Sequence, residues 1–211
     1  MLDTIHRCDQ VQWLLVTKRP ELWESRLRQA VCSLQTEDGK HVENPLWHFI
    51  SRWLPWNGIN RYEPPQHIML LASAENQNTA DERIPELLKI PAASHGVSCE
   101  PLLGPIEMDL YWLGAGGRTG RNYQQPQVDW VIVGGESGRE ARSCNVDWIH
   151  SLKDQCQQAD VPVFVKQLGA NPEPRTGSGW GPVRATKGDN QDEWPRCLVV
   201  REHPNTTPDS A

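Results

Sequence analysis

Five short apolar runs constrain the fold of this chain more than any other feature of its sequence. The runs lack the alternation of strands that have one face in water, and they fit strands buried on both faces of a parallel sheet. Polar, charged or turn-forming residues follow each run directly. The runs lie at residues 13–16, 68–72, 96–99, 130–133 and 161–165.

Helical patterns separate several of these runs. Pro20 suits the first turn of a helix with apolar residues at 23, 27, 30, 31 and 34, and Asn145 can cap a second helix. Between residues 75 and 97 we expect a shorter helix, entered at Pro85. The repeat of strand and helix predicts the α/β class, as a partial (β/α) barrel of parallel strands with about five βα units.

The expected domain covers residues 1–170, and residues 171–211 form a C-terminal tail packed on it. Residues 35–66 interrupt the repeat as an insertion, and their Trp-rich stretch 45–56 has the spacing of an amphipathic helix. An open sheet has two edges, which proteins usually cover. We expect stretch 45–56 and the tail to supply that cover.

Three further segments carry predictions. Residues 114–127 are rich in Gly, Gln and Arg and predict a surface loop, and residues 196–201 fit one last strand. Residues 3–10 look like the end of a helix that runs straight into the first apolar run. A strand normally precedes such a helix, and a closed barrel has eight βα units, so we expect the beginning of the barrel to be missing.

The composition argues against membrane-spanning and disordered proteins. A mean hydropathy of -0.62 describes a polar globular chain, and no run approaches the roughly 20 apolar residues of a membrane span. The net charge of -6 argues against a dominant nucleic-acid-binding surface and leaves room for a local basic patch. We expect a cytoplasmic protein with no membrane contact.

The six cysteines are scattered, with no C-x-x-C or other close spacing. Zinc and iron–sulfur sites need closely set thiolates. The sequence therefore predicts reduced, mostly packed thiols, with no metal site and no cofactor held by this chain.

Charged residues follow the predicted strands at the edge where parallel α/β proteins bind their ligands. Glu75, Glu100 and Glu136 each follow an apolar run within three positions, so we expect them to face one another as candidate catalytic carboxylates. The alternative is a ring of structural salt bridges without a substrate.

A second group at this edge is suited to an anionic ligand. Two cations precede a helix N-terminus, and glycines after a strand let backbone N–H groups approach an anion. The glycines can equally serve only a tight turn. The candidate ligand-binding residues are Thr17, Lys18, Arg19, Asn76, Gly134, Gly135, Ser137, Lys166 and Gln167.

The strand-end motifs, taken in order, carry a resemblance to a known family. The motifs are LLVTKRPE at 14–21, SAENQ at 73–77 with ADERIP at 80–85, SCEPLLGPI at 98–106, DWVIVGGESG at 129–138 and FVKQLG at 164–169, followed by EWP at 193–195 and VRE at 200–202 in the tail. Together they resemble the phage-associated family of unknown function labelled phage protein gp thirty-seven/sixty-eight, over about residues 11–203. Members of that family resemble radical S-adenosylmethionine enzymes.

The resemblance implies a [4Fe–4S] cluster and S-adenosylmethionine in full-length relatives, held by an N-terminal cysteine motif. This chain has no such motif, because Cys8 and Cys32 stand alone. We therefore expect the C-terminal part of a radical-S-adenosylmethionine-like protein, inactive by itself, with an unknown, nucleic-acid-derived substrate. A homodimer, or a partner that supplies the missing N-terminal half, remains open.

Two other functions compete with this one. The chain can be a non-catalytic module that binds phosphate or another anion at the strand ends. It can also be a metal-independent hydrolase or lyase that uses paired carboxylates such as Glu100 and Glu136, provided both reach one substrate.

Overall fold

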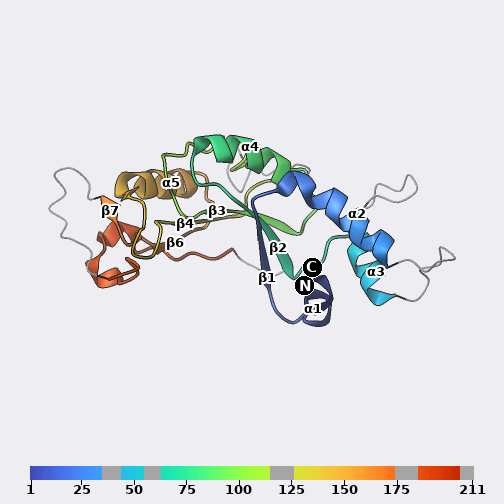
Figure 1. The fold of residues 1–211 in the computed structure, drawn as a ribbon. Helices are drawn as coiled ribbons and strands as arrows, with labels where there is room; N and C mark the ends of the chain where they lie inside the picture. The colour runs from blue at the N-terminus through green and yellow to red at the C-terminus, as the bar shows by residue number, and fades with distance from the viewer. Residues whose placement is uncertain (35–43, 55–62, 115–125, 174–184, 205–211) are drawn as a thin grey trace.

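Five parallel strands form one sheet, and their order in space follows their order along the chain (Figure 1). The computed structural model describes residues 1–34, 44–54, 63–114, 126–173 and 185–204. The sheet order is β1 (Trp13–Thr17), β2 (Ile68–Ser73), β3 (Ser94–Cys99), β4 (Trp130–Gly134) and β6 (Val163–Gln167). The predicted α/β class with parallel strands is confirmed.

Helices connect the strands, and α4 and α5 lie on the same face of the sheet, α4 over β2 and β3 and α5 over β4 and β6 (Figure 1). The N-terminal helices α1, α2 and α3 gather around the β1 end. The helices are α1 (Leu2–Arg7), α2 (Trp23–Ser33), α3 (Pro45–Ser51), α4 (Gln77–Leu88) and α5 (Val146–Gln158), with 3-10 turns η1 (Pro20–Leu22), η2 (Gln191–Glu193) and η3 (Arg196–Leu198). A small second sheet pairs β5 (Cys144–Asn145) with β7 (Pro172–Glu173).

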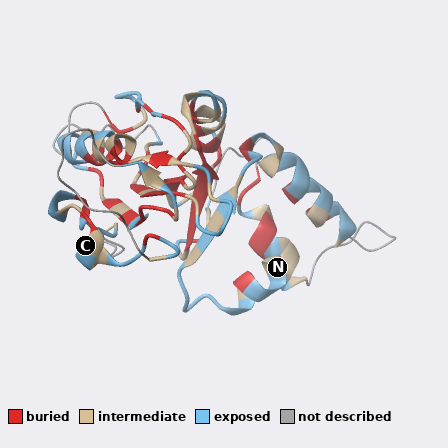
Figure 2. Cartoon of the chain, turned by 60° about the vertical axis from the view of Figure 1, so that its left-hand side comes forward, coloured by how far each residue is buried: buried red, intermediate tan, exposed pale blue. Residues whose placement is uncertain are grey.

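Burial on both faces explains the continuous apolar runs. All six residues of β2 are buried, and Figure 2 shows buried residues concentrated where the sheet meets its helices. Alternate residues such as Leu70 pack toward the helices, whereas Met69 and Leu71 join a small cluster with Trp130.

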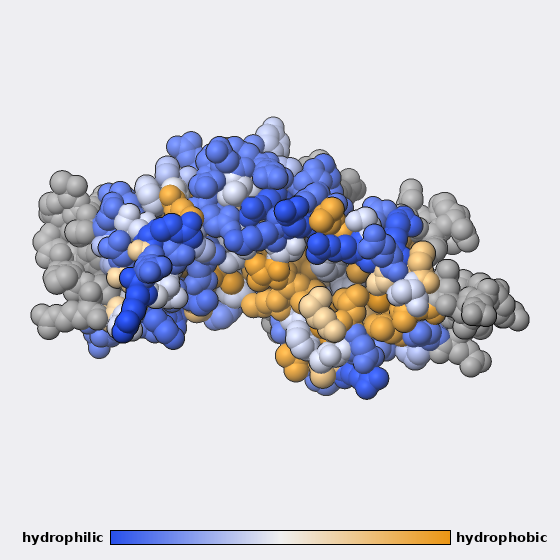
Figure 3. Space-filling view, in the orientation of Figure 1, coloured by the Kyte–Doolittle hydropathy of each residue, from blue (hydrophilic) through white to orange (hydrophobic). Residues whose placement is uncertain are grey.

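Strand β1 departs from the expected burial. Its residues alternate between half-buried and exposed, with Leu14 44% and Val16 54% exposed. The reason is its position, since β1 is an edge strand with one sheet neighbour, β2. Figure 3 shows apolar surface gathered in this part of the molecule.

Helix α4 begins at Gln77, so the predicted entry at Pro85 is wrong. Asn76 caps the helix, because its side chain accepts a hydrogen bond from the Thr79 backbone N–H (3.1 Å). The Thr79 hydroxyl in turn accepts from the Asn76 backbone N–H (3.1 Å), which completes a capping box. This capping box starts the helix about two turns before the predicted entry, so Pro85 lies inside the helix.

The tail covers the outer edge of β6, as expected, although residues 196–201 are not a strand. Arg196–Leu198 is a 3-10 turn, and only Arg201 makes an antiparallel bridge, to Phe164. Val165 donates its backbone N–H to the Val200 carbonyl (2.9 Å), and Glu202 donates to the Val163 carbonyl (3.0 Å). Two hydrogen bonds at this spacing close the edge without a regular strand.

Residues 45–51 of the Trp-rich stretch form helix α3, which packs against α1 and α2. Its buried residues Phe49 and Ile50, with Trp53 beyond the helix end, pack in the cluster that holds Ile68 and Leu70 of β2. Trp13 and Leu15 of the edge strand β1 pack against the same cluster, so α3 shares a core with both β1 and β2. Residues 55–56 of that stretch, and residues 115–125 of the predicted loop, lie outside the described residues.

We predict that Asn76→Ala lowers the free energy of unfolding by about 1 kcal/mol, because the Thr79 N–H loses its acceptor. The matched control is Asn78→Ala in the first turn of α4, an exposed site where we expect a change within about 0.5 kcal/mol. Urea unfolding at neutral pH measures both. Equal values for the two variants would contradict the capping role.

Candidate functional site

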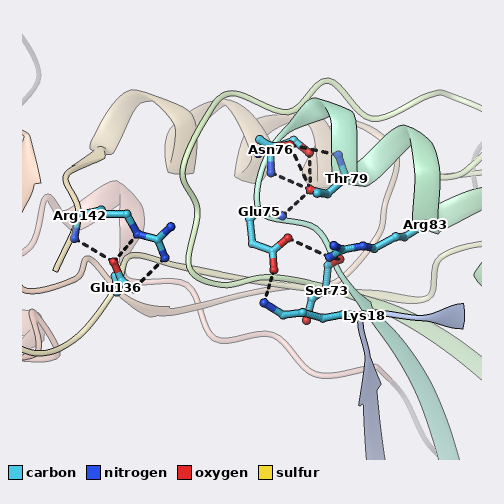
Figure 4. Close-up of polar contacts among 8 residues, drawn as sticks. All are labelled: Lys18, Ser73, Glu75, Asn76, Thr79, Arg83, Glu136 and Arg142. Carbon is cyan, nitrogen blue, oxygen red and sulfur yellow. Dashed lines mark hydrogen bonds and ion pairs between the residues drawn. The ribbon is translucent and has the colours of Figure 1, made fainter.

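Glu75 lies at the centre of the charged groups at the carboxyl end of β2 (Figure 4). One carboxylate oxygen is 2.6 Å from Lys18 Nζ, and the other accepts a hydrogen bond from Arg83 Nη1 at 2.9 Å. Lys18 follows the neighbouring strand β1, and Arg83 comes from helix α4. Two neighbouring strand ends and one helix thus converge on a single carboxylate.

The helix cap positions this carboxylate. The backbone N–H of Glu75 donates to the Thr79 hydroxyl at 2.9 Å, within the same capping box that orders Asn76. Arg83 also donates to the Ser73 carbonyl at 2.9 Å, so its guanidinium is held by β2 at two points. The geometry of the pair therefore depends on the start of α4 and not on the flexible side chains alone.

Burial and charge act on Glu75 in opposite directions. Only 10% of its side chain is exposed, and this burial alone would raise the pKa of the carboxyl. The close contact with Lys18 and the positive charge of Arg83 outweigh burial, and the pKa of Glu75 is lowered. The contact with Lys18 at 2.6 Å is an ion pair whose angles do not meet those of a hydrogen bond. Glu75 is therefore ionised at neutral pH.

Glu100 makes a second ion pair across the sheet end. Its carboxylate accepts a hydrogen bond from Lys166 Nζ at 3.0 Å. Glu100 follows β3 and Lys166 belongs to β6, and β4 lies between these strands. The pair therefore links the ends of strands that are not neighbours. The predicted residues Glu100 and Lys166 are brought together.

Glu136 makes the third pair, with Arg142 in the segment after β4 (Figure 4). Arg142 Nε and Nη2 each donate to a separate carboxylate oxygen at 2.8 Å, and its backbone N–H donates to Glu136 Oε2 at 2.9 Å. These bonds from Arg142 hold the pKa of Glu136 at about 2. The pKa of Arg142 is raised, first by its hydrogen bonds to Glu136 and also by the charge of Glu75, so the first and third pairs interact.

The two glycines after β4 permit close packing against β6. A Cβ on Gly134 would lie 2.9 Å from the Gln167 carbonyl oxygen, and one on Gly135 would overlap the Leu168 carbonyl. The Gly135 N–H donates to the Gln167 carbonyl at 3.1 Å, and the Gln167 side chain donates to the Gly135 carbonyl at 3.0 Å. The Gly135 N–H thus has a partner within the protein, and both glycines have a packing reason to be small.

The remaining predicted ligand-binding residues surround these pairs. The Thr17 hydroxyl accepts from the Arg19 backbone N–H at 3.0 Å and orders the corner after β1. Arg19 Nη1 lies 4.0 Å from Glu21 Oε1. Ser137, the residue after Glu136, is exposed. Asn76 caps α4.

Sequence reasoning did not single out two cations of the site, Arg83 and Arg142. Arg83 lies two helical turns after the Asn76 cap, so a correct start for α4 would have indicated that it faces back toward Glu75. Arg142 comes six residues after Glu136 in a segment without regular periodicity. No local signal in the sequence pointed to that pair.

The cysteines do not fit an iron–sulfur cluster. Cys99, Cys144 and Cys156 are buried, whereas Cys8, Cys32 and Cys197 are exposed, so the expectation that most of the thiols are packed is wrong for half of them. Burial raises the pKa of the Cys144 and Cys156 thiols to about 12, which disfavours the thiolate that a cluster needs. In the ranges that the structure describes, no three His, Cys, Asp or Glu side chains are grouped so that they could hold a metal ion.

The sheet and its three strand-end pairs define an α/β protein with a charged carboxyl edge. The model of the family described as "Protein of unknown function (DUF5131)" matches residues 1–195. The chain belongs to this family. Comparisons with curated proteins and with solved structures gave no significant match. Within the described residues, none of the helices has the length and apolar content that crossing a membrane requires.

We predict that Glu75→Gln lowers the free energy of unfolding at neutral pH by about 2 kcal/mol, because it leaves the half-buried Arg83 guanidinium without a counter-charge. The lowered pKa of Glu75 contributes stability that is present above the unfolded-state pKa and is lost as the pH falls through the folded-state pKa. The wild type should therefore lose more stability than the variant on acidification from about pH 7 to about pH 3.

Urea unfolding over that pH range is the measurement. Glu82→Gln, an exposed position on the same helix, is the matched control and should keep the pH dependence of the wild type. A Glu75→Gln curve parallel to the wild-type curve would contradict the assignment.

Proposed function

We propose that this chain binds a phosphate-bearing, nucleic-acid-derived substrate at the carboxyl edge of its sheet, as the substrate-binding part of a phage-associated, radical-S-adenosylmethionine-like protein. The observation that supports this most is the exposure of three cations at one sheet edge. The side chains of Lys18, Arg142 and Lys166 are 61%, 60% and 54% exposed, although each contacts a carboxylate.

An anionic ligand can recruit these cations at low cost. Lys18 and Lys166 each contact one carboxylate oxygen, and exposed pairs of this kind contribute only about 0–1 kcal/mol, so these lysines can turn toward a phosphate without a large penalty. Arg142 is bonded to both oxygens of Glu136 and is held more firmly. The less exposed Arg83–Glu75 pair, with 16% and 10% of its side chains exposed, can stay in place as the support. The arrangement therefore combines a fixed pair with two adjustable lysines and one exposed arginine.

The ion pairs argue against acid catalysis by Glu75 and Glu136. A general acid at neutral pH needs a carboxyl with a raised pKa. The pKa of Glu75 is lowered and that of Glu136 is about 2, so both are ionised and cannot donate a proton. The hydrolase or lyase alternative is therefore less well supported than ligand binding.

The proposed relationship to radical enzymes has one supporting feature and one limit. The strand order follows the chain, as it does in (β/α) barrels. The cysteines of the described residues do not fit a cluster, so no step of a radical reaction is assigned to them. We propose that cluster-binding cysteines, where they occur, lie outside this chain, on a partner or on the remainder of a longer protein.

We predict that inorganic phosphate at about ten times its dissociation constant raises the Tm of the wild type by about 3 °C, because it binds only the folded chain. Lys166→Ala should abolish this shift. Lys89→Ala removes an exposed lysine paired with Glu86 at the end of α4, and this control should keep the shift. Thermal denaturation monitored by circular dichroism measures it.

Sodium chloride at matched ionic strength separates specific binding from screening, because screening affects all exposed pairs alike. If phosphate gives no more protection than sodium chloride, the strand-end pairs are structural salt bridges and the proposal fails. Equal protection of the Lys166→Ala and Lys89→Ala variants would also overturn it.

For the radical relationship, we predict that this chain alone, treated anaerobically with iron and sulfide, shows no visible absorption band of a [4Fe–4S] cluster. The product of the whole native reading frame, with its natural partner if one copurifies, should show that band and cleave S-adenosylmethionine reductively. A whole product that does neither would disprove the relationship while leaving the phosphate prediction to be judged separately.

A further inference from the structure

Three side chains form a cysteine–histidine–aspartate cluster away from the strand-end site. Cys197 Sγ lies 2.9 Å from His150 Nε2, and His150 Nδ1 lies 3.9 Å from Asp154 Oδ2. Cys197 is exposed on η3, and the other two residues belong to α5. The family match covers His150 and Asp154 but not Cys197, and the proposed function uses none of the three.

The cluster follows from how η3 packs on α5. His150 and Asp154 are four residues apart and therefore share one side of the helix. Leu198 is fully buried in the main core with Ile149 and Leu152 of α5, and it anchors η3 against the helix. This anchor holds the neighbouring Cys197 beside His150, although the two are 47 positions apart in the sequence.

The geometry provides a base for the thiol. His150 directs one ring nitrogen at the sulfur, so the imidazole can take up the thiol proton and leave a thiolate beside an imidazolium. The Asp154 carboxylate faces the other ring nitrogen and can stabilise that positive charge. Lys153 Nζ lies 2.7 Å from Asp154 Oδ1, and this contact is the main reason why the pKa of Asp154 is lowered. The charge of His150 lowers it further.

We propose that Cys197 is an activated surface thiol that undergoes thiol–disulfide exchange with low-molecular-weight disulfides. The Cys197 thiolate attacks one sulfur of the disulfide, a new S–S bond forms, and the original S–S bond breaks. The departing thiolate takes the proton held on His150. Cys197 and one half of the disulfide become a mixed disulfide, and the other half leaves as a reduced thiol.

The other cysteines of the chain serve as internal standards. Cys99, Cys144 and Cys156 are buried, and burial raises the pKa of each. Cys8 and Cys32 are exposed like Cys197. Within the described residues, neither of their sulfur atoms has a hydrogen bond to a histidine. Their reaction rates therefore represent thiols that are exposed but have no neighbouring base.

The experiment is exposure of the folded chain to glutathione disulfide at about pH 6.5, where an ordinary exposed thiol is only about 1% thiolate. Mass spectrometry of quenched digests gives the rate at each cysteine. We expect Cys197 to form the mixed disulfide about tenfold faster than Cys8 and Cys32, since the lower nucleophilicity of a stabilised thiolate offsets part of its larger population.

His150→Gln should reduce the rate at Cys197 to that at Cys8 and Cys32, and Asp154→Asn should reduce it by about threefold. Both variants should leave the rates at Cys8 and Cys32 unchanged.

If Cys197 reacts no faster than these two in the wild type, the proposal is wrong. It is equally overturned if His150→Gln, with a far-ultraviolet spectrum like that of the wild type, keeps the fast rate. Should that variant unfold, the comparison within the wild type still decides.

Discussion

A parallel sheet that is packed on both faces leaves few places for charge. Every residue of β2 is buried, and a charged side chain within such a strand would lose its hydration. The first charge that follows β2 is Glu75, just beyond the carboxyl end of the strand. The same constraint places Lys18 and Glu100 at the ends of the neighbouring strands, so the charged groups of β1, β2 and β3 collect at their carboxyl ends.

The ion pairs at the carboxyl ends of the strands differ in burial. The buried pair supports the structure, whereas the exposed cations are available to a ligand. The Arg83–Glu75 pair is largely withdrawn from water and is tied to the helix cap and to the β2 backbone, so its loss leaves an uncompensated charge. Lys18, Arg142 and Lys166 keep their charged ends in solvent. A buried, stable ion pair with exposed cations around it suits a site that binds an anion.

Much of this edge followed from local pattern. Glu75, Glu100 and Glu136 each follow an apolar run within three positions, and chain direction alone brings such residues to one edge. The start of α4 was misplaced because proline is a strong helix-start signal, whereas the Asn76–Thr79 capping box determines the helix boundary. That error also concealed Arg83, since its direction depends on where the helix begins.

The sequence by itself determined the parallel α/β class, the positions of the strands and the carboxylates that follow them, because these depend on hydrophobic periodicity and chain direction. Only the tertiary structure decided which cation each carboxylate meets, that β1 is a half-exposed edge strand, and that Cys197 lies beside His150. Such pairings depend on contacts between residues far apart in the chain, and no local periodicity encodes them.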